Sequence, residues 1–107
     1  GNCCTGCNYG AKNTLLTNYL FIAQQSGAQI FTQVEVDTIE KSGDVYKLNL
    51  RMIPSVGRVT KKTITAKHVF LGAGSKGSTE ILMRSQSQKF KFSQALGTKL
   101  SANGDVM

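Results

Sequence analysis

Residues 13–26 place apolar side chains at helical spacing. These positions gather on one broad face, which consists of Leu15, Leu16, Tyr19, Leu20, Ile22 and Ala23. Asn13 suits the N-cap, and Gly27 suits the left-handed turn that ends many helices. The pattern therefore predicts one helix over 13–26, followed by a short buried strand at 28–31.

From residue 34 the pattern changes to the period-two alternation of half-buried strands. Val34, Val36 and Thr38 fall on one side of the first predicted strand. The second strand has an apolar side and a polar side, formed by Tyr46, Leu48, Leu50 and Met52 and by Lys47, Asn49 and Arg51 respectively. Turn signals at 42–44 and 54–57 separate these strands from a third at 58–66. The alternation predicts an antiparallel three-stranded meander within residues 28–66.

Residues 68–84 join an apolar run to a series of glycines. The run predicts a strand at 68–72 that is covered on both faces, and a second helix is predicted from 77 to 84. Gly72, Gly74 and Gly77 have the GxGxxG spacing of dinucleotide-binding turns. Such a fingerprint also needs an acidic residue at the end of a second strand about 20 residues later. No such strand follows, so this turn is not predicted to be the primary pyrophosphate site, and an ordinary tight strand-to-helix turn explains it equally well.

Length and composition favour a single small domain. A chain of 107 residues, 40% of them hydrophobic, can bury one modest core, so we expect one domain over 1–107. The predicted elements indicate the α/β class, or α+β when the chain is taken alone. Residues 85–107 carry only a weak pattern. No apolar run approaches the roughly 20 residues that span a bilayer, and we expect a soluble, cytoplasmic protein without a membrane span.

The chain carries a net charge of +7, which suits anionic partners. Its central basic residues are scattered over the predicted strands and turns: Lys41, Lys47, Arg51, Arg58, Lys61, Lys62 and Lys67. Scattered basic residues are typical of solvated sheet edges, whereas a nucleic-acid surface would concentrate them on one face. We therefore do not expect nucleic acid to be the partner.

Three cysteines lie close together in the N-terminal segment 1–11: Cys3, Cys4 and Cys7. Three thiolates are one ligand short of a structural zinc or iron–sulfur site, and His68 could complete the set only if the fold brought it there. His68 is the single histidine, and its place at the start of an apolar run indicates a core or edge residue. No pair of carboxylates and no nucleophile–base group is visible, so no catalytic residue is predicted.

Three sequence words, in this order, resemble the middle of a known family: "GAKNTLLTNYL", "GAGSKGSTEILMRS" and "LGTKLSANGD". They are similar to the flavin-dependent glucose-methanol-choline (GMC) oxidoreductases, and among these to the cholesterol oxidase type. The resemblance implies a piece of an FAD-binding, Rossmann-like domain, with the meander inserted between a helix and parallel strands. It also implies FAD as the cofactor of a longer enzyme that oxidises an alcohol or sterol.

The same resemblance implies four cofactor-binding residues. The turn Gly72-Ala73-Gly74 resembles the family's second glycine turn, which lies beside the FAD pyrophosphate and ribose. Val36 resembles the position whose main-chain N–H and C=O pair with the adenine edge. The family's first fingerprint and its catalytic histidine are absent from this chain, so we expect no activity from it alone and weak or no FAD binding.

The expected partners are FAD and the remainder of the longer enzyme. The predicted strands 28–31 and 68–72 would be left with open edges, which predicts self-association through them. Two other functions stay open at this stage. One is a small basic α+β binding module for a nucleotide or nucleic acid, and the other is a metal-binding module built on the cysteine cluster.

Overall fold

The computed structural model describes residues 6–99 and 101. The chain divides into two compact units, residues 1–32 and residues 33–107. We describe each unit separately. In the described part of the chain, no helix is long and apolar enough to cross a membrane.

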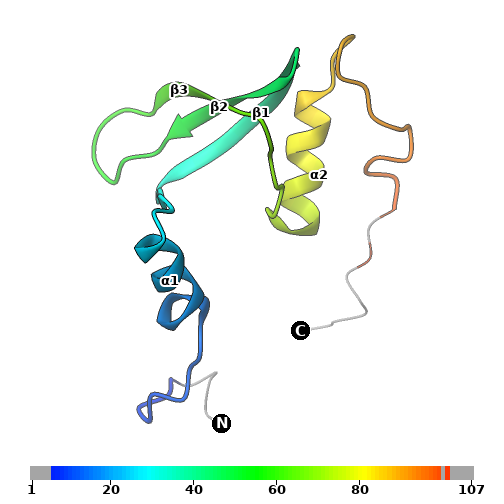
Figure 1. The fold of residues 1–107 in the computed structure, drawn as a ribbon. Coiled ribbons are helices and arrows are strands. Elements are labelled where there is room, and N and C mark those ends of the chain that lie inside the picture. The colour runs from blue at the N-terminus through cyan, green and yellow to red at the C-terminus, as the bar shows by residue number, and fades with distance from the viewer. Residues whose placement is uncertain (1–5, 100, 102–107) are drawn as a thin grey trace. The chain divides into compact units, whose positions relative to one another are not determined.

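The first unit contains two short helical pieces where one helix was predicted. These are the 3-10 turn η2, Leu15–Thr17, and the helix α1, Tyr19–Gln25 (Figure 1). Asn18 separates them, because its backbone leaves the helical region and its side-chain oxygen accepts the N–H of Tyr19 at 2.6 Å. The N-cap of α1 is therefore Asn18, and the prediction of Asn13 at this place is wrong.

The end of α1 was predicted correctly at Gly27. Its φ of +90° is a left-handed conformation that favours glycine. The Gly27 N–H donates to Gln24 C=O at 3.0 Å and the Ala28 N–H donates to Ala23 C=O at 2.9 Å. These two bonds form the Schellman motif, which satisfies the last carbonyls of a helix.

The strand predicted at 28–31 is not formed, so that prediction is wrong. A strand exists only when a neighbour satisfies its backbone, and the described sheet contains only β1, β2 and β3. Ile30 and Phe31 are consequently 44% and 70% exposed. Residues 28–31 have the residue types of a strand, but no described strand pairs with them.

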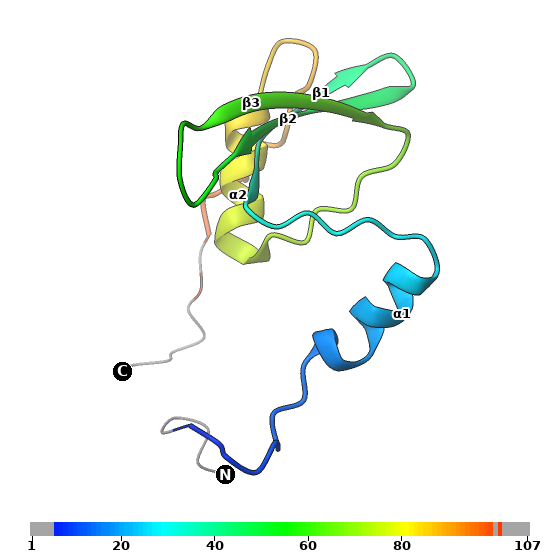
Figure 2. The same ribbon diagram turned by 90° about the vertical axis from the view of Figure 1, so that its left-hand side faces the viewer.

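The second unit is built on the predicted antiparallel meander, which is confirmed. Its strands are β1, Val34–Ser42, β2, Val45–Met52, and β3, Thr60–Ala66, in the order β1-β2-β3 (Figures 1 and 2). Gly43, with φ +60°, makes the tight turn between the first two strands. The apolar side of β2 faces the core as predicted, with Leu48 and Leu50 both 9% exposed.

β1 contains a bulge that the alternation did not predict. The register pairs Val36 with Leu50 but Thr38 with Asn49, so Asp37 is an extra residue. An extra residue reverses the alternation. Val34 and Val36 therefore face the core before the bulge, and Ile39 faces it afterwards. Thr38 lies on the polar face, where it accepts a hydrogen bond from Asn49, and its predicted place beside Val34 and Val36 is wrong.

Helix α2, Gly74–Ser85, packs on the sheet through Ile81, which is 7% exposed. The core consists of Ile39, Leu48, Leu50 and Ile81. The second helix was predicted to begin at residue 77, and it begins three residues earlier because Gly74 already closes the turn. In Figures 1 and 2, α2 and β1 run side by side in the same general direction.

The strand predicted at 68–72 is also not formed. Val69 and Leu71 pack against the core, but Phe70 between them is 98% exposed. The side chains of this segment alternate between core and solvent, but no described strand forms backbone hydrogen bonds with it as a sheet partner. The described residues therefore contain no parallel strands, and their class is α+β. Self-association through 28–31 and 68–72 stays a prediction, although neither segment forms a strand.

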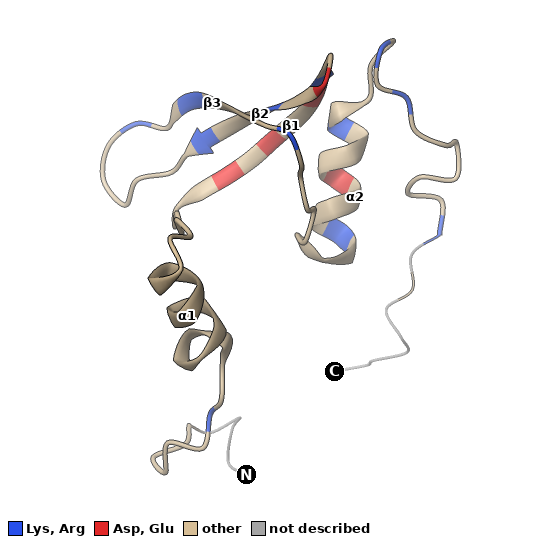
Figure 3. Ribbon diagram, in the orientation of Figure 1, with Lys and Arg blue, Asp and Glu red and all other residues tan. Residues whose placement is uncertain are grey.

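Residues 86–99 contain no helix or strand, in keeping with their weak pattern. Phe90 fixes this segment to the core, with its ring centroid 6.3 Å from that of Tyr46 and 4.6 Å from that of Phe92. Figure 3 shows basic residues spread over β2, β3, α2 and this segment. Charge is not concentrated on one described element.

Candidate functional site

Val36 lies in the edge strand β1 with its side chain half-buried against the core. The Ile53 N–H donates to Gln33 C=O at 2.8 Å, so these two residues form a hydrogen-bonded pair. Such pairs alternate with non-hydrogen-bonded pairs along an antiparallel ladder, which makes the Val36–Leu50 pair non-hydrogen-bonded. The N–H and C=O of Val36 therefore point away from β2, toward the outer edge of the sheet.

Two hydrogen bonds show that backbone groups next to Val36 also point outward. The Asp37 C=O accepts a hydrogen bond from Arg84 Nε at 3.0 Å. The Ile39 N–H donates to Ser85 Oγ at 2.8 Å. Both groups leave the ladder to meet α2, so the bulge directs main-chain polar groups of β1 outward.

The glycine turn leads directly into α2. Gly74 has φ +76°, which favours glycine, and the Ala73 N–H donates to Ser78 Oγ at 3.1 Å. A Cβ added at Gly72 or Gly74 would meet no atom within 4 Å, so the turn is bare on that side. The first turn of α2 carries no acidic residue. Its free N–H groups and positive dipole end favour an anion, and Lys76 lies beside them.

One of the four predicted cofactor residues and the residue before the glycine turn pack against the same core. Val36 packs against this core from β1. Leu71, which directly precedes the glycine turn, packs against it from the segment that follows β3. The fold thus places an outward main-chain edge and a bare glycine turn in the same unit. This combination suits a ligand that has both a hydrogen-bonding ring edge and phosphate groups.

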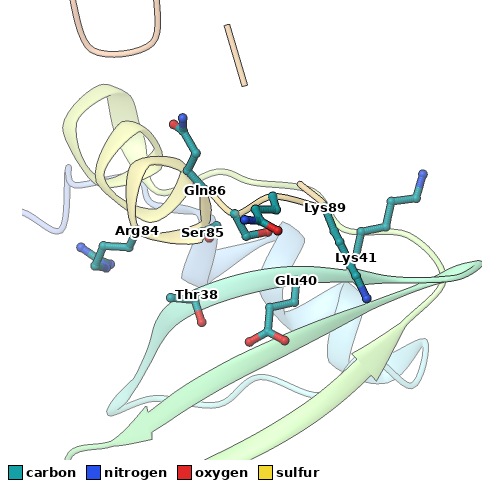
Figure 4. A pocket seen from close by; sticks show the side chains of 9 residues that line it. Thr38, Glu40, Lys41, Arg84, Ser85, Gln86 and Lys89 are labelled. Atoms are coloured by element: carbon teal, nitrogen blue, oxygen red, sulfur yellow. The ribbon is translucent and has the colours of Figure 1, made fainter. Parts of the chain in front are cut away.

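An open groove of about 350 Å³ lies at the other end of α2. It lies between residues 38–41 of β1 and residues 84–89, and it includes none of the predicted site residues (Figure 4). Arg84 pairs with Asp37 and Glu80 at 3.6 and 3.8 Å. The groove is therefore bounded by the contacts that join α2 to β1.

The polar face of the sheet has charges that are largely paired. Arg51 binds Glu35 across the strands, and this hydrogen bond and charge raise the pKa of Arg51. Asn49 donates to Thr38 Oγ1 and Glu40 Oε1 at 2.9 and 2.7 Å. On β2, both basic side chains of this face have an acidic partner, because Lys47 pairs with Glu40 as Arg51 does with Glu35.

Only Cys7 of the three cysteines lies within the described residues. Hydrogen bonds from the backbone N–H of Ala11, and then of Tyr9, lower the pKa of its thiol. In the described part of the chain, no group of three His, Cys, Asp or Glu side chains is placed to hold a metal ion. Because Cys3 and Cys4 fall outside that part, the metal-binding alternative stays a prediction. His68 is exposed in the segment before the glycine turn.

Comparison with known proteins decides the family. The model of the GMC oxidoreductases matches residues 1–102. The chain belongs to the GMC oxidoreductases. This match is to the N-terminal, FAD-binding region of the family, whose members use FAD. The predicted resemblance is therefore confirmed.

Curated relatives of this GMC chain include cholesterol oxidases. Those of two Mycobacterium tuberculosis strains are 34% identical over 108 residues, and that of Acinetobacter baumannii is 30% identical over 113 residues. Each alignment covers 98% of this chain but only 19–20% of the relative. The chain thus spans about a fifth of their length. No solved structure matches it significantly.

The sequence analysis missed the side chains that join α2 to β1. Arg84 was predicted only as the last residue of the second helix, Ser85 fell in the weakly patterned segment 85–107, and Asp37 received no role within the first predicted strand. One signal was present, because the apolar positions Val34, Val36 and Ile39 change parity across Asp37. A parity change within one strand indicates a bulge.

Proposed function

We propose that this chain forms part of the FAD site of a cholesterol oxidase-type GMC oxidoreductase. Val36 pairs with the adenine edge through its main-chain N–H and C=O. Gly72, Ala73 and Gly74 lie beside the pyrophosphate and ribose. The outward direction of the Val36 backbone supports this proposal most directly, because a strand buried on both edges could not read a base.

The bare glycine turn also fits the cofactor. A side chain at Gly72 or Gly74 would occupy the space through which a pyrophosphate approaches the backbone. The absence of an acidic residue from the first turn of α2 removes a charge that would repel phosphate. Both features are properties of this chain's own residues.

The longer enzyme is proposed to oxidise a hydroxyl group of an alcohol or sterol. When bound, FAD supplies the hydride acceptor for this chemistry. The described residues bind and orient the cofactor, and none of them is assigned as a catalytic acid or base. The substrate class rests on the cholesterol oxidases that the chain resembles.

Binding by this chain alone is expected to be weak. Each main-chain hydrogen bond contributes about 0.5–1.5 kcal/mol net, whereas a Kd of 1 mM already needs about 4.1 kcal/mol. Two bonds at Val36 contribute about 1–3 kcal/mol together, so a millimolar Kd also needs the contacts of the glycine turn.

An NMR titration of the ¹⁵N-labelled chain with ADP tests the proposal. The amide signals of Val36, Gly72 and Gly74 are expected to shift together along one weak binding curve. Signals of Ala23 in α1 and Asn49 on the polar face serve as internal controls and are expected to stay in place. Shifts confined to the groove near Lys41 and Lys89 would contradict the proposal, as would the absence of any shift.

A further inference from the structure

Ser85 is the one polar side chain that the fold buries among the described residues, with 4% exposure. Its hydroxyl accepts the Ile39 N–H at 2.8 Å and donates to the Ile81 C=O one helical turn earlier at 2.6 Å. Ile39 and Ile81 are themselves members of the core. Ser85 therefore fixes the end of α2 to the backbone of β1 at the centre of the unit.

Arg84 makes a second connection one residue away. Its Nε donates to the Asp37 C=O at 3.0 Å and lies 3.6 Å from the Asp37 carboxylate. It also pairs with Glu80 at 3.8 Å, and Glu80 pairs with Lys76 at 3.8 Å. A continuous row of charges thus runs along α2, from the turn after Gly74 to the bulge of β1.

The Arg84 connection ends on the bulge residue itself, and the Ser85 connection ends just after the bulge. The bulge residue Asp37 directly follows Val36, and Ile39 lies two residues further along. We name the four residues Asp37, Ile39, Arg84 and Ser85 the α2–β1 clamp. The clamp holds one end of α2, while the Gly72–Gly74 turn lies at the other end, about 18 Å away for a helix of 12 residues.

We propose that Arg84 and Ser85 are positioning residues for the dinucleotide. The clamp sets where α2 lies along β1, and so sets the separation between the Val36 backbone and the glycine turn. A ligand that spans both points gains from each only when their separation is fixed in advance. This inference rests on the proposed function, because it assigns a spacing role within the same site.

A comparison of two ligands distinguishes a positioning role of Arg84 and Ser85 from simple structural support. Both ligands carry the adenine proposed to pair with Val36, and ADP brings a second phosphate to the glycine turn. Loss of positioning lowers ADP affinity more than AMP affinity, so the advantage of ADP over AMP falls. Loss of folding lowers both affinities together.

The experiment measures AMP and ADP affinities by NMR for the wild-type chain and for Arg84→Met and Ser85→Ala. The ADP-over-AMP ratio is expected to fall by about fivefold in each, the lower range of coupling between two sites. Arg84→Lys is expected to restore part of the ratio, because an ammonium can still reach Asp37. Lys89→Met is the matched control, since Lys89 lines the same groove and has no ion-pair partner among the described residues. Its ratio is expected to equal that of the wild type.

Each other result overturns a stated claim. An unchanged ratio in Arg84→Met and Ser85→Ala overturns the positioning role, and so does an equal fall in Lys89→Met. A parallel fall of both affinities assigns the clamp to stability alone. Failure of AMP and ADP to bind the wild type overturns the proposed function itself. If Ser85→Ala does not fold, as shown by loss of the dispersed amide signals, the surface variant Arg84→Met decides.

Discussion

The two units differ in what their apolar residues pack against. In residues 33–107, a helix face and a sheet face meet, and Ile39 and Ile81 are 4% and 7% exposed. In residues 6–32, neither η2 nor α1 buries a residue, and Leu16 and Tyr19 are 73% and 68% exposed. Both regions have an amphipathic sequence. The difference teaches that a pattern specifies which face is apolar, while stability depends on a second surface that covers it.

Ile81→Ala and Ile22→Ala test this comparison with the same substitution in the two units. Ile81 is 7% exposed in the core, so its truncation is expected to cost about 2–5 kcal/mol of unfolding free energy. Ile22 is 56% exposed in α1, and its truncation is expected to cost less than about 0.5 kcal/mol. Urea unfolding followed by the amide signals of β2 measures both. Equal losses would show that α1 is covered as well as the core is.

Gly27→Ala and Gly74→Ala compare the left-handed glycines of the two units. With φ of +90° and +76°, each alanine variant is expected to cost about 1–2 kcal/mol locally. The loss at Gly74 is expected in the unfolding of β2 and α2, whereas Gly27→Ala is expected to lower only the helical signal of α1. Gly72→Ala is the control, since this glycine is not left-handed and its site is open. A change in β2 stability in Gly27→Ala would contradict this expectation.

The sequence predicted those parts of the fold that depend on neighbours along the chain. The alternation of β2 and the turn at Gly43 are local features, and both were located correctly. The segments 28–31 and 68–72 failed because a strand needs a partner that no local pattern supplies. The break at Asn18 arises from a side chain capping its own neighbour, which competes with a continuous helix.

In the candidate site too, features that are local in sequence could be predicted, whereas contacts between distant residues could not. The glycine turn could be located from spacing, and Val36 from a resemblance in sequence. The outward direction of the Val36 backbone depends on the register with β2, and the clamp joins residues 46 and 47 positions apart. Such contacts are fixed by packing of α2 on β1, which sequence spacing alone does not determine.

The smallest expected effect is a shift in the pKa of Cys7, which lies in the first unit, residues 1–32. The N–H groups of Ala11 and Tyr9 stabilise the thiolate, so the pKa of Cys7 lies below its ordinary value. A lowered pKa means that the stabilising contribution is present above the unfolded pKa and is lost as the pH falls through the folded pKa. The pH midpoint of Cys7 alkylation, located by peptide mass spectrometry, is therefore expected to be lower in buffer than in urea. Ala11→Pro removes the N–H that contributes most, and it is expected to move the midpoint in buffer toward the urea value. A midpoint that is equal in buffer and urea would show that the turn around Cys7 does not persist in solution, which would extend the contrast between the units to the backbone itself.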